Sequence, residues 1–136
     1  GGVPIGVVMT TLKDVFSAGD HGSTFGGNFL STTAACEVVD ILNEMYDSGE
    51  LQKNIDYFDS ELEKFYNKHR EIFISKVGIG MMCGLRVKDS DTKAREEGVV
   101  VLKAGRDTLR LLPALTITKE EVDEGFNALN RTLNSL

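Results

Sequence analysis

Residues 81–87 have the sequence Met-Met-Cys-Gly-Leu-Arg-Val, in which the apolar positions 81, 83, 85 and 87 alternate with positions 82, 84 and 86. A period of two is typical of a strand that buries one face. The turn Gly78-Ile79-Gly80 precedes this segment. Downstream, residues 99–102 and 108–112 are predicted as two further strands, joined by a turn at residues 103–107 that is centred on Gly105.

Helical patterns flank this strand region. Residues 35–45 carry apolar side chains three and four positions apart, and Gly49 closes that segment. A clean amphipathic stripe follows at Leu51, Ile55, Phe58, Leu62 and Phe65. The last helix begins after Thr118, which forms a capping box with Glu121. With a short helix expected within residues 89–97, this order predicts an α+β layer with helices on one face of a small, mostly antiparallel sheet.

The N-terminal part of the chain has a different character. Residues 3–9 are apolar and β-branched, which predicts a short buried strand. Residues 19–28, Gly-Asp-His-Gly-Ser-Thr-Phe-Gly-Gly-Asn, are predicted as a polar loop that leads into the first helix. Its hydroxyl and backbone N–H groups suit a phosphate. No Gly-Lys-Ser/Thr ends it, so it is not a Walker loop, and a plain connection is the alternative on composition alone.

Composition limits the classes of partner. The 136 residues hold 15 Lys and Arg against 21 Asp and Glu, a net charge of −6 without a basic cluster, which argues against binding nucleic acid or an anionic membrane. No apolar run approaches the roughly 20 residues of a spanning helix, and no signal peptide is recognised. We therefore expect a cytoplasmic protein, with Cys36 and Cys83 packed as small hydrophobic residues rather than bridged.

Titratable side chains offer few further candidates. His69 is predicted to be solvated, at the end of the second helix beside Lys68 and Arg70. No Cys/His spacing suits zinc, so no metal site is expected. Arg110 stands out, because it lies in the apolar segment Leu109-Arg110-Leu111-Leu112-Pro113. If buried, its guanidinium needs an anionic partner, either an internal carboxylate such as Glu37 or Asp40, or the carboxylate of a small substrate that it binds through two parallel hydrogen bonds.

Three segments occur together and in order along the chain. They are Gly2-Val3-Pro4-Ile5-Gly6, the loop of residues 19–28, and Leu109-Arg110-Leu111-Leu112-Pro113-Ala114-Leu115 before Ile117-Thr118 and an acidic helix. Together they resemble class III pyridoxal-phosphate-dependent aminotransferases over essentially the whole chain. The resemblance implies the C-terminal part of such an enzyme, with the α/β fold of the pyridoxal-phosphate-dependent transferases of fold type I. Residues 1–31 would end the cofactor-binding large domain, and residues 32–136 would form the α+β small domain.

The resemblance also implies roles for individual residues. Thr24, assisted by Ser23, would bind the phosphate of pyridoxal 5'-phosphate on the neighbouring subunit, so a homodimer with shared sites is expected. Arg110 would bind the α-carboxylate of the substrate. The Schiff-base lysine of the family lies upstream of the residues that match the Gly2–Gly6 segment. We therefore expect no catalytic residue in this chain, and no activity from the chain alone.

The reaction implied for the parent protein is amino transfer from N-acetylornithine to 2-oxoglutarate, in arginine biosynthesis. Ornithine, N-succinylornithine and 4-aminobutyrate are alternative amino donors, because most of the pocket that selects the donor lies upstream. A non-catalytic binding or interaction module descended from the family is a further alternative. The chain departs from the family pattern at Phe29, where a proline is usual, and in a shorter segment at residues 89–97.

Overall fold

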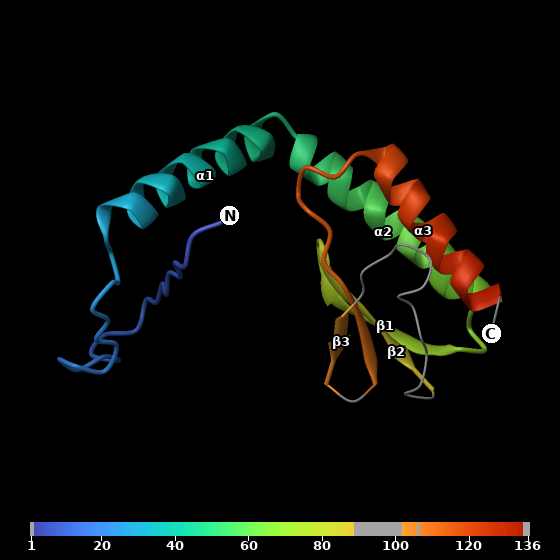
Figure 1. The fold of residues 1–136 in the computed structure, drawn as a ribbon, viewed down its shortest axis with the longest axis horizontal. Helices are drawn as coiled ribbons and strands as arrows, with labels where there is room; N and C mark the ends of the chain where they lie inside the picture. The colour runs from blue at the N-terminus through green and yellow to red at the C-terminus, as the bar shows by residue number, and fades with distance from the viewer. Residues whose placement is uncertain (1, 89–101, 106, 135–136) are drawn as a thin grey trace. The chain divides into compact units, whose positions relative to one another are not determined.

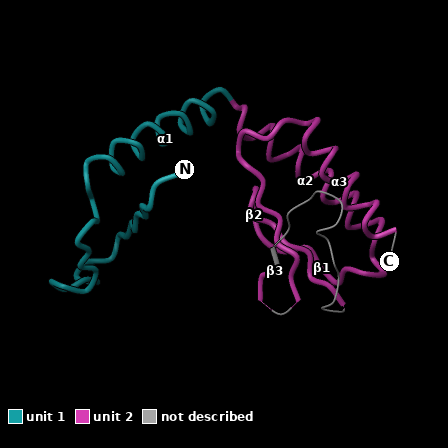
Figure 2. The backbone as a smooth tube through the Cα atoms, viewed as in Figure 1, with its two compact units in different colours: residues 1–48 teal, residues 49–136 magenta. Residues whose placement is uncertain are grey.

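The computed structural model describes residues 2–88, 102–105 and 107–134. The chain divides into two compact units, Gly1–Ser48 and Gly49–Leu136 (Figure 2). Unit 1 contains helix α1 (Phe29–Asp47), and unit 2 contains all the other elements. The boundary expected near residue 31 is the one between the large and small domains of the family. It stays a prediction, because units 1 and 2 are defined only by contacts within this chain.

Unit 2 is a four-stranded antiparallel sheet with two helices on one face (Figure 1). Its strands lie in the order β1-β2-β4-β3, and every neighbouring pair is antiparallel. Helices α2 and α3 lie side by side and pack together. The element bounds are α2 Glu50–Lys68, β1 Phe73–Ile79, β2 Met82–Val87, β3 Leu102–Ala104, β4 Thr108–Leu111 and α3 Lys119–Asn134.

The predicted antiparallel sheet is confirmed, with one strand added. Strand β2 follows the alternation at residues 81–87, and β4 covers most of the segment predicted at residues 108–112. Strand β1 was not predicted, because Lys76 and Gly78 interrupt its apolar pattern. Of the strand predicted at residues 99–102, only Leu102 is described, at the start of β3, and the short helix expected within residues 89–97 lies outside the described residues.

The core of unit 2 lies between the sheet and the two helices. The α2 stripe supplies Phe58, Leu62 and Phe65, as predicted, and the ring of Phe65 packs against those of Phe73 and Phe126 at centroid distances of 5.7 and 5.5 Å. The remaining buried members are Met81, Cys83, Leu85, Val87, Leu111, Val122 and Leu129. Burying a side chain of this size contributes about 1.5–3 kcal/mol, so this single core holds unit 2 together.

The start of α3 has the predicted capping box. The backbone N–H of Glu121 donates to Thr118 Oγ1 at 3.2 Å, and the backbone N–H of Thr118 donates to Glu121 Oε2 at 2.9 Å. Two N–H groups that the helix itself leaves without acceptors are thereby satisfied. The cap fixes where α3 begins, and therefore which residues it turns toward the sheet.

The prediction of a solvated His69 is wrong. This residue ends α2 but is only 5% exposed, and its Nε2 lies 2.8 Å from Oδ1 of Asn130 on α3. Asn130 Nδ2 donates to the backbone oxygen of Phe126, so its Oδ1 is the acceptor and His69 Nε2 carries the proton. Lys68 Nζ donates to the same Oδ1. The pair ties the end of α2 to α3 across 61 positions of sequence.

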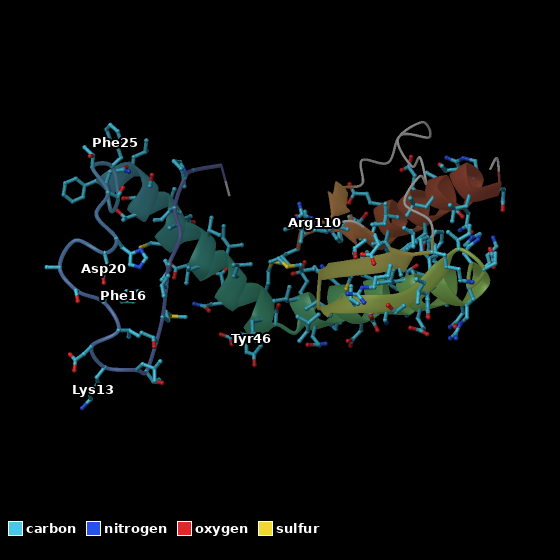
Figure 3. All side chains as sticks on the ribbon, turned by 90° about the horizontal axis from the view of Figure 1, so that it is seen from below. Lys13, Phe16, Asp20, Phe25, Tyr46 and Arg110 are labelled. Atoms are coloured by element: carbon cyan, nitrogen blue, oxygen red, sulfur yellow. The ribbon has the colours of Figure 1, made fainter. Side chains whose placement is uncertain are left out.

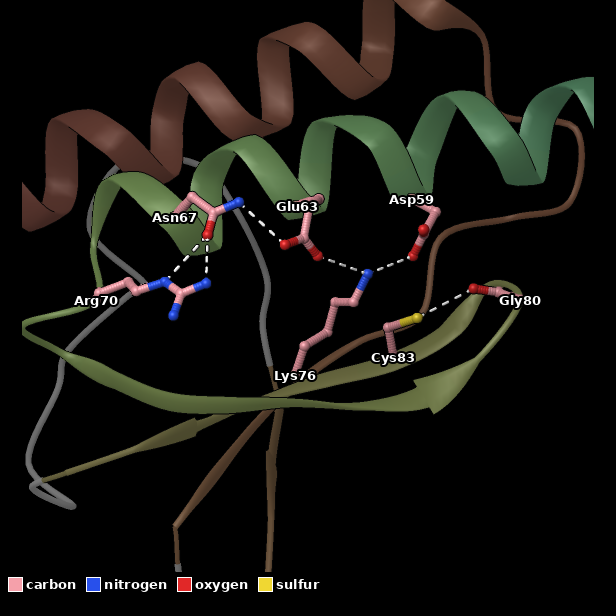
Figure 4. Close-up of polar contacts among 7 residues, drawn as sticks. All are labelled: Asp59, Glu63, Asn67, Arg70, Lys76, Gly80 and Cys83. Carbon is pink, nitrogen blue, oxygen red and sulfur yellow. Dashed lines mark hydrogen bonds and ion pairs between the residues drawn. The ribbon is translucent and has the colours of Figure 1, made fainter.

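Lys76 joins the sheet to α2 through charge (Figure 4). It pairs with Leu85 in the sheet, so it lies on the helix-covered face, and its Nζ contacts Asp59 at 2.8 Å and Glu63 at 3.0 Å. The hydrogen bond to Asp59 raises the pKa of Lys76. Hydrogen bonds from Lys76 and Asn67 lower the pKa of Glu63. An ion pair at the rim of the core therefore fixes β1 against α2.

The two cysteines behave differently. Cys83 is buried as predicted; its thiol donates to the backbone oxygen of Gly80, and burial raises its pKa. Cys36 is exposed, so the prediction that it packs as a small hydrophobic residue is wrong. Both are free thiols. Cys36 lies on α1, where Met45 is the only apolar residue among the described residues of that helix that is fully buried.

The strand predicted at residues 3–9 is absent from unit 1. The described residues of this segment are not in a strand, and Val7, Val8 and Met9 are 79, 73 and 90% exposed. An apolar segment forms a stable strand only beside a neighbouring strand, and none lies among the described residues of unit 1. The loop predicted at residues 19–28 is confirmed as a series of turns, and α1 follows it.

None of the helices in the described residues is long and apolar enough to cross a membrane.

Asn130→Ala should destabilise unit 2 by about 1–3 kcal/mol, because buried His69 loses the acceptor of its ring N–H. The free energy of unfolding, measured by denaturant titration, checks this. Asn127→Ala on the exposed side of the same helix is the matched control, with a change within about 0.5 kcal/mol. Equal losses from both variants would contradict the role of the His69–Asn130 pair.

The Lys76 ion pairs predict a pH dependence of stability. A lysine whose pKa is raised by folding stabilises the folded state at pH values below its pKa in the unfolded chain. This contribution is lost as the pH rises through its pKa in the folded state. The lowered pKa of Glu63 stabilises the fold above about 4.3, its unfolded value, and that contribution is lost as the pH falls through the folded pKa. The stability difference between the wild type and Lys76→Met should therefore be greater at pH 7 than at pH 3. Lys53→Met, on the exposed side of α2, is the matched control, and its stability difference from the wild type should not change with pH. A stability difference for Lys76→Met that is the same at both pH values would contradict the role of the ion pairs.

Candidate functional site

Residues 22–28 form a tight polar turn before α1. A Cβ atom on Gly26 would lie 2.9 Å from Cβ and 3.0 Å from Oγ of Ser23, so the turn closes only with glycine there. Asn28 then caps α1, because its Oδ1 accepts from the backbone N–H of Ser31 at 3.0 Å while its Nδ2 donates to the oxygen of Phe25 at 2.8 Å. The turn that contains Thr24 therefore leads directly into the capped start of α1.

Thr24 and Ser23 present hydroxyl groups to solvent. Both residues are exposed, and neither hydroxyl is hydrogen-bonded to another described residue. They lie just before the first turn of a 19-residue helix, where N–H groups and the helix dipole favour an anion. Hydroxyl donors beside a helix N-terminus fit a phosphate group. The phosphate prediction for these residues is compatible with the turn, and their binding role stays a prediction.

Arg110 lies on the face of the sheet that α2 and α3 leave open (Figure 3). Its strand neighbours Leu109 and Leu111 pack toward the core, whereas Arg110 itself is exposed. Within the described residues of unit 2 it forms no ion pair. The predicted period of two on this strand is confirmed. The guanidinium is thus a charge on an open sheet face, where it needs no internal partner in unit 2.

Arg86 shares this open face, and sequence reasoning did not single it out. It pairs with Thr108 in the β2–β4 ladder, while Gly84 pairs with Arg110. Its side chain is exposed, as are those of Met82 and Leu112. The signal was present in the sequence: residues 82, 84 and 86 alternate with the apolar positions 81, 83, 85 and 87, so they had to lie opposite the core.

Thr24 and Arg110 belong to different units, and each is described within its own unit. Among the described residues there is no group of three or more His, Cys, Asp or Glu side chains that suits a metal ion. His69 and Cys83 are engaged in packing and internal hydrogen bonds. The candidates that remain for binding a small molecule are the polar turn of unit 1 and the open sheet face of unit 2.

A family model described as "Aminotransferase class-III" matches residues 1–133. The chain belongs to the class III aminotransferase family. Enzymes of this family use pyridoxal phosphate, and the match covers both the polar turn and the open sheet face.

Curated relatives agree with this assignment. The chain is 49% identical to acetylornithine aminotransferase of Wolinella succinogenes, over 100% of this chain and 36% of the relative. It is 38% identical to succinylornithine transaminase of Photorhabdus laumondii, over 98% of this chain and 35% of the relative. The chain spans about a third of the length of these proteins.

Solved structures of the family share the fold. Acetylornithine aminotransferase of Elizabethkingia anophelis is 26% identical, with a TM-score of 0.70, over 90% of this chain and 33% of that one. Ornithine delta-aminotransferase of Plasmodium falciparum is 27% identical, also with a TM-score of 0.70, over 88% of this chain and 32% of that one. The predicted α/β fold of the pyridoxal-phosphate-dependent aminotransferases is therefore confirmed.

Proposed function

We propose that this chain is the C-terminal part of an acetylornithine aminotransferase, which transfers an amino group from N-acetylornithine to 2-oxoglutarate in the cytoplasm. The 49% identity to the Wolinella succinogenes enzyme supports this donor. The observation that carries the proposal is the exposed guanidinium of Arg110, on an apolar strand and without an ion pair among the described residues of unit 2.

Arg110 binds the substrate through its α-carboxylate. A guanidinium presents a planar pair of N–H donors that matches both oxygens of a carboxylate. Because Leu109 and Leu111 anchor β4 in the core, the strand holds the arginine in a fixed direction. The same contact serves both half-reactions, since the amino donor and the 2-oxo acid each carry a carboxylate.

Thr24 and Ser23 hold the phosphate of pyridoxal phosphate. The exposed hydroxyl groups and the nearby N-terminus of α1 are suited to that dianion. In this proposal the phosphate belongs to the cofactor of a neighbouring subunit, so the protein is a homodimer. Pyridoxal phosphate, when bound, supplies the electron sink for amino transfer, and the residues of this chain bind and orient.

The identity of the amino donor is open to a second candidate. The 38% identity to a succinylornithine transaminase supports N-succinylornithine, in which, as in N-acetylornithine, one of the two amines of ornithine is acylated. Ornithine and 4-aminobutyrate lack that acyl group. Comparing kcat/KM for the four donors with 2-oxoglutarate as acceptor identifies the substrate.

Arg110→Lys should lower kcat/KM for donor and acceptor alike, by about 2–5 kcal/mol of transition-state binding, because lysine keeps the charge but loses the two-point contact. The melting temperature should hardly change, since the partner of Arg110 arrives with the substrate. Steady-state kinetics and thermal unfolding of the complete, cofactor-loaded protein provide the measurement. A large loss of stability with near-normal kinetics would instead assign Arg110 to an internal carboxylate such as Glu37 or Asp40.

The 136-residue chain alone should show no transaminase turnover. A lysine attacks a carbonyl only as the neutral amine, and Lys76, the least exposed lysine among the described residues, has its pKa raised by Asp59. The other lysines whose side chains are described are solvent-exposed. Incubation with pyridoxal phosphate and borohydride, followed by mass spectrometry, should find no site-specific lysine modification. Turnover by the purified chain that borohydride abolishes would refute this expectation.

A further inference from the structure

We propose that Asn54 is a positioning residue for Arg110: its side-chain amide holds the segment that leaves β4, and so sets the direction in which the strand presents the guanidinium. This inference rests on the function proposed above, in which Arg110 binds a substrate carboxylate. It assigns to α2, a helix on the opposite side of the sheet, a part in the affinity for that carboxylate.

The segment in question, residues 112–118, connects β4 to α3 and contains neither helix nor strand (Figure 1). Arg110 is the second-last residue of β4, and the last pair of the β2–β4 ladder joins Leu111 to Cys83. The backbone therefore leaves the sheet two positions after Arg110. A shift of the segment acts first on the end of the strand that carries the guanidinium.

Asn54 joins this segment to α2. Its Nδ2 donates to the backbone oxygen of Leu115 at 3.2 Å, across 61 positions of sequence. The chain turns at this point, because the backbone N–H of Ile117 donates to the oxygen of Ala114 at 3.1 Å. Pro113, whose ring fixes its backbone φ angle, limits how far the chain between the turn and β4 can adjust. A displacement of Leu115 is therefore passed on toward the strand.

Packing beneath the segment is incomplete. A cavity of about 160 Å³ lies between the segment and α3, and its lining includes Leu112, Pro113 and Ile117 from the segment and Val122 and Gly125 from the helix. A Cβ atom on Gly125 would meet no atom within 4 Å, so this part of the cavity has room. Atoms that line a void lack the dispersion contacts that hold a packed segment in place. The hydrogen bond from α2 therefore supplies restraint that packing does not.

Arg110 also lacks a side-chain neighbour across one side of its strand. Cross-strand side-chain pairs normally stabilise a strand residue, but the residue directly across from Arg110 in β2 is Gly84. An exposed pair of arginine and carboxylate contributes little unless its geometry is well held. The direction of the guanidinium thus depends on the backbone of β4, which continues into the segment that Asn54 holds.

The test is a double-mutant cycle on the complete, cofactor-loaded protein. Asn54→Ala should raise KM for the amino donor and for 2-oxoglutarate about tenfold and change kcat less than about twofold, because carboxylate binding is common to the ground state and the transition state. In an Arg110→Lys background the same substitution should change KM less than about twofold, since no two-point contact remains to be oriented. Asn54→Gln keeps an amide donor and should restore part of the affinity.

A ligand that cannot react gives the same comparison without turnover. N-acetylnorvaline carries the carboxylate and the acylated amine but has no amine to transfer, and calorimetry should show it bound about tenfold more weakly by Asn54→Ala. The melting temperature of this variant should fall by less than about 4 °C. Gln52→Ala is the matched control, since this amide binds Asp56 within α2, and it should change neither KM nor Kd.

Each other outcome is decisive. A KM effect of equal size in both backgrounds would overturn the proposal, because Asn54 would then act independently of Arg110. A large fall in melting temperature with unchanged KM would also overturn it, since Asn54 would serve stability alone. In both cases the transaminase proposal stands if Arg110→Lys still impairs turnover. If the wild type transfers no amino group from any donor, the proposed function fails, and the N-acetylnorvaline titration still decides the role of Asn54. A wild type that does not bind N-acetylnorvaline either would overturn both.

Discussion

Helices α2 and α3 cover one face of the unit 2 sheet and leave the other face open among the described residues. Because side chains of a strand alternate between faces, this one-sided burial decides the environment of every strand residue. Leu85, Leu109 and Leu111 pack against the helices, whereas Arg86 and Arg110 lie on the opposite side. The core that stabilises the unit and the candidate binding surface therefore lie on opposite faces of the same sheet.

The cations on the two faces of the sheet differ in whether they have a carboxylate partner. Lys76 faces the helices, and the pKa values of Lys76 and Glu63 are shifted in the directions that stabilise their ion pair. On the other face the arginines have no carboxylate partner among the described residues of unit 2. One set of charges joins α2 to β1. The other set remains for an anion that comes from outside the unit.

Local signals in the sequence predicted most of unit 2. The stripe of α2, the capping box of α3 and the alternation in β2 and β4 depend on residues a few positions apart. Failures arose where a partner lies far away in sequence. His69 is buried because Asn130 accepts its proton, and β1 includes Lys76 because α2 supplies two carboxylates. The Val3–Met9 segment was predicted as a strand, but no described neighbour in unit 1 pairs with it.

Physical reasoning from the sequence alone predicted only part of the candidate site. The position of Arg110 within an apolar strand indicated a carboxylate partner, but the pattern did not distinguish a substrate from an internal acid. For Thr24, a Gly- and Ser-rich turn was a weak signal, and the family motif carried the assignment. Arg86 was missed because a single arginine opposite a core position resembles an ordinary surface residue until the register places it next to Arg110.

A crystal structure of the complete, cofactor-loaded protein with a bound dicarboxylate would show whether the open face of this sheet binds a carboxylate. We expect two parallel hydrogen bonds from the Arg110 guanidinium to one carboxylate of the ligand, within about 3 Å. An Arg110 guanidinium paired instead with an aspartate or glutamate of the protein, with the ligand bound elsewhere, would contradict it.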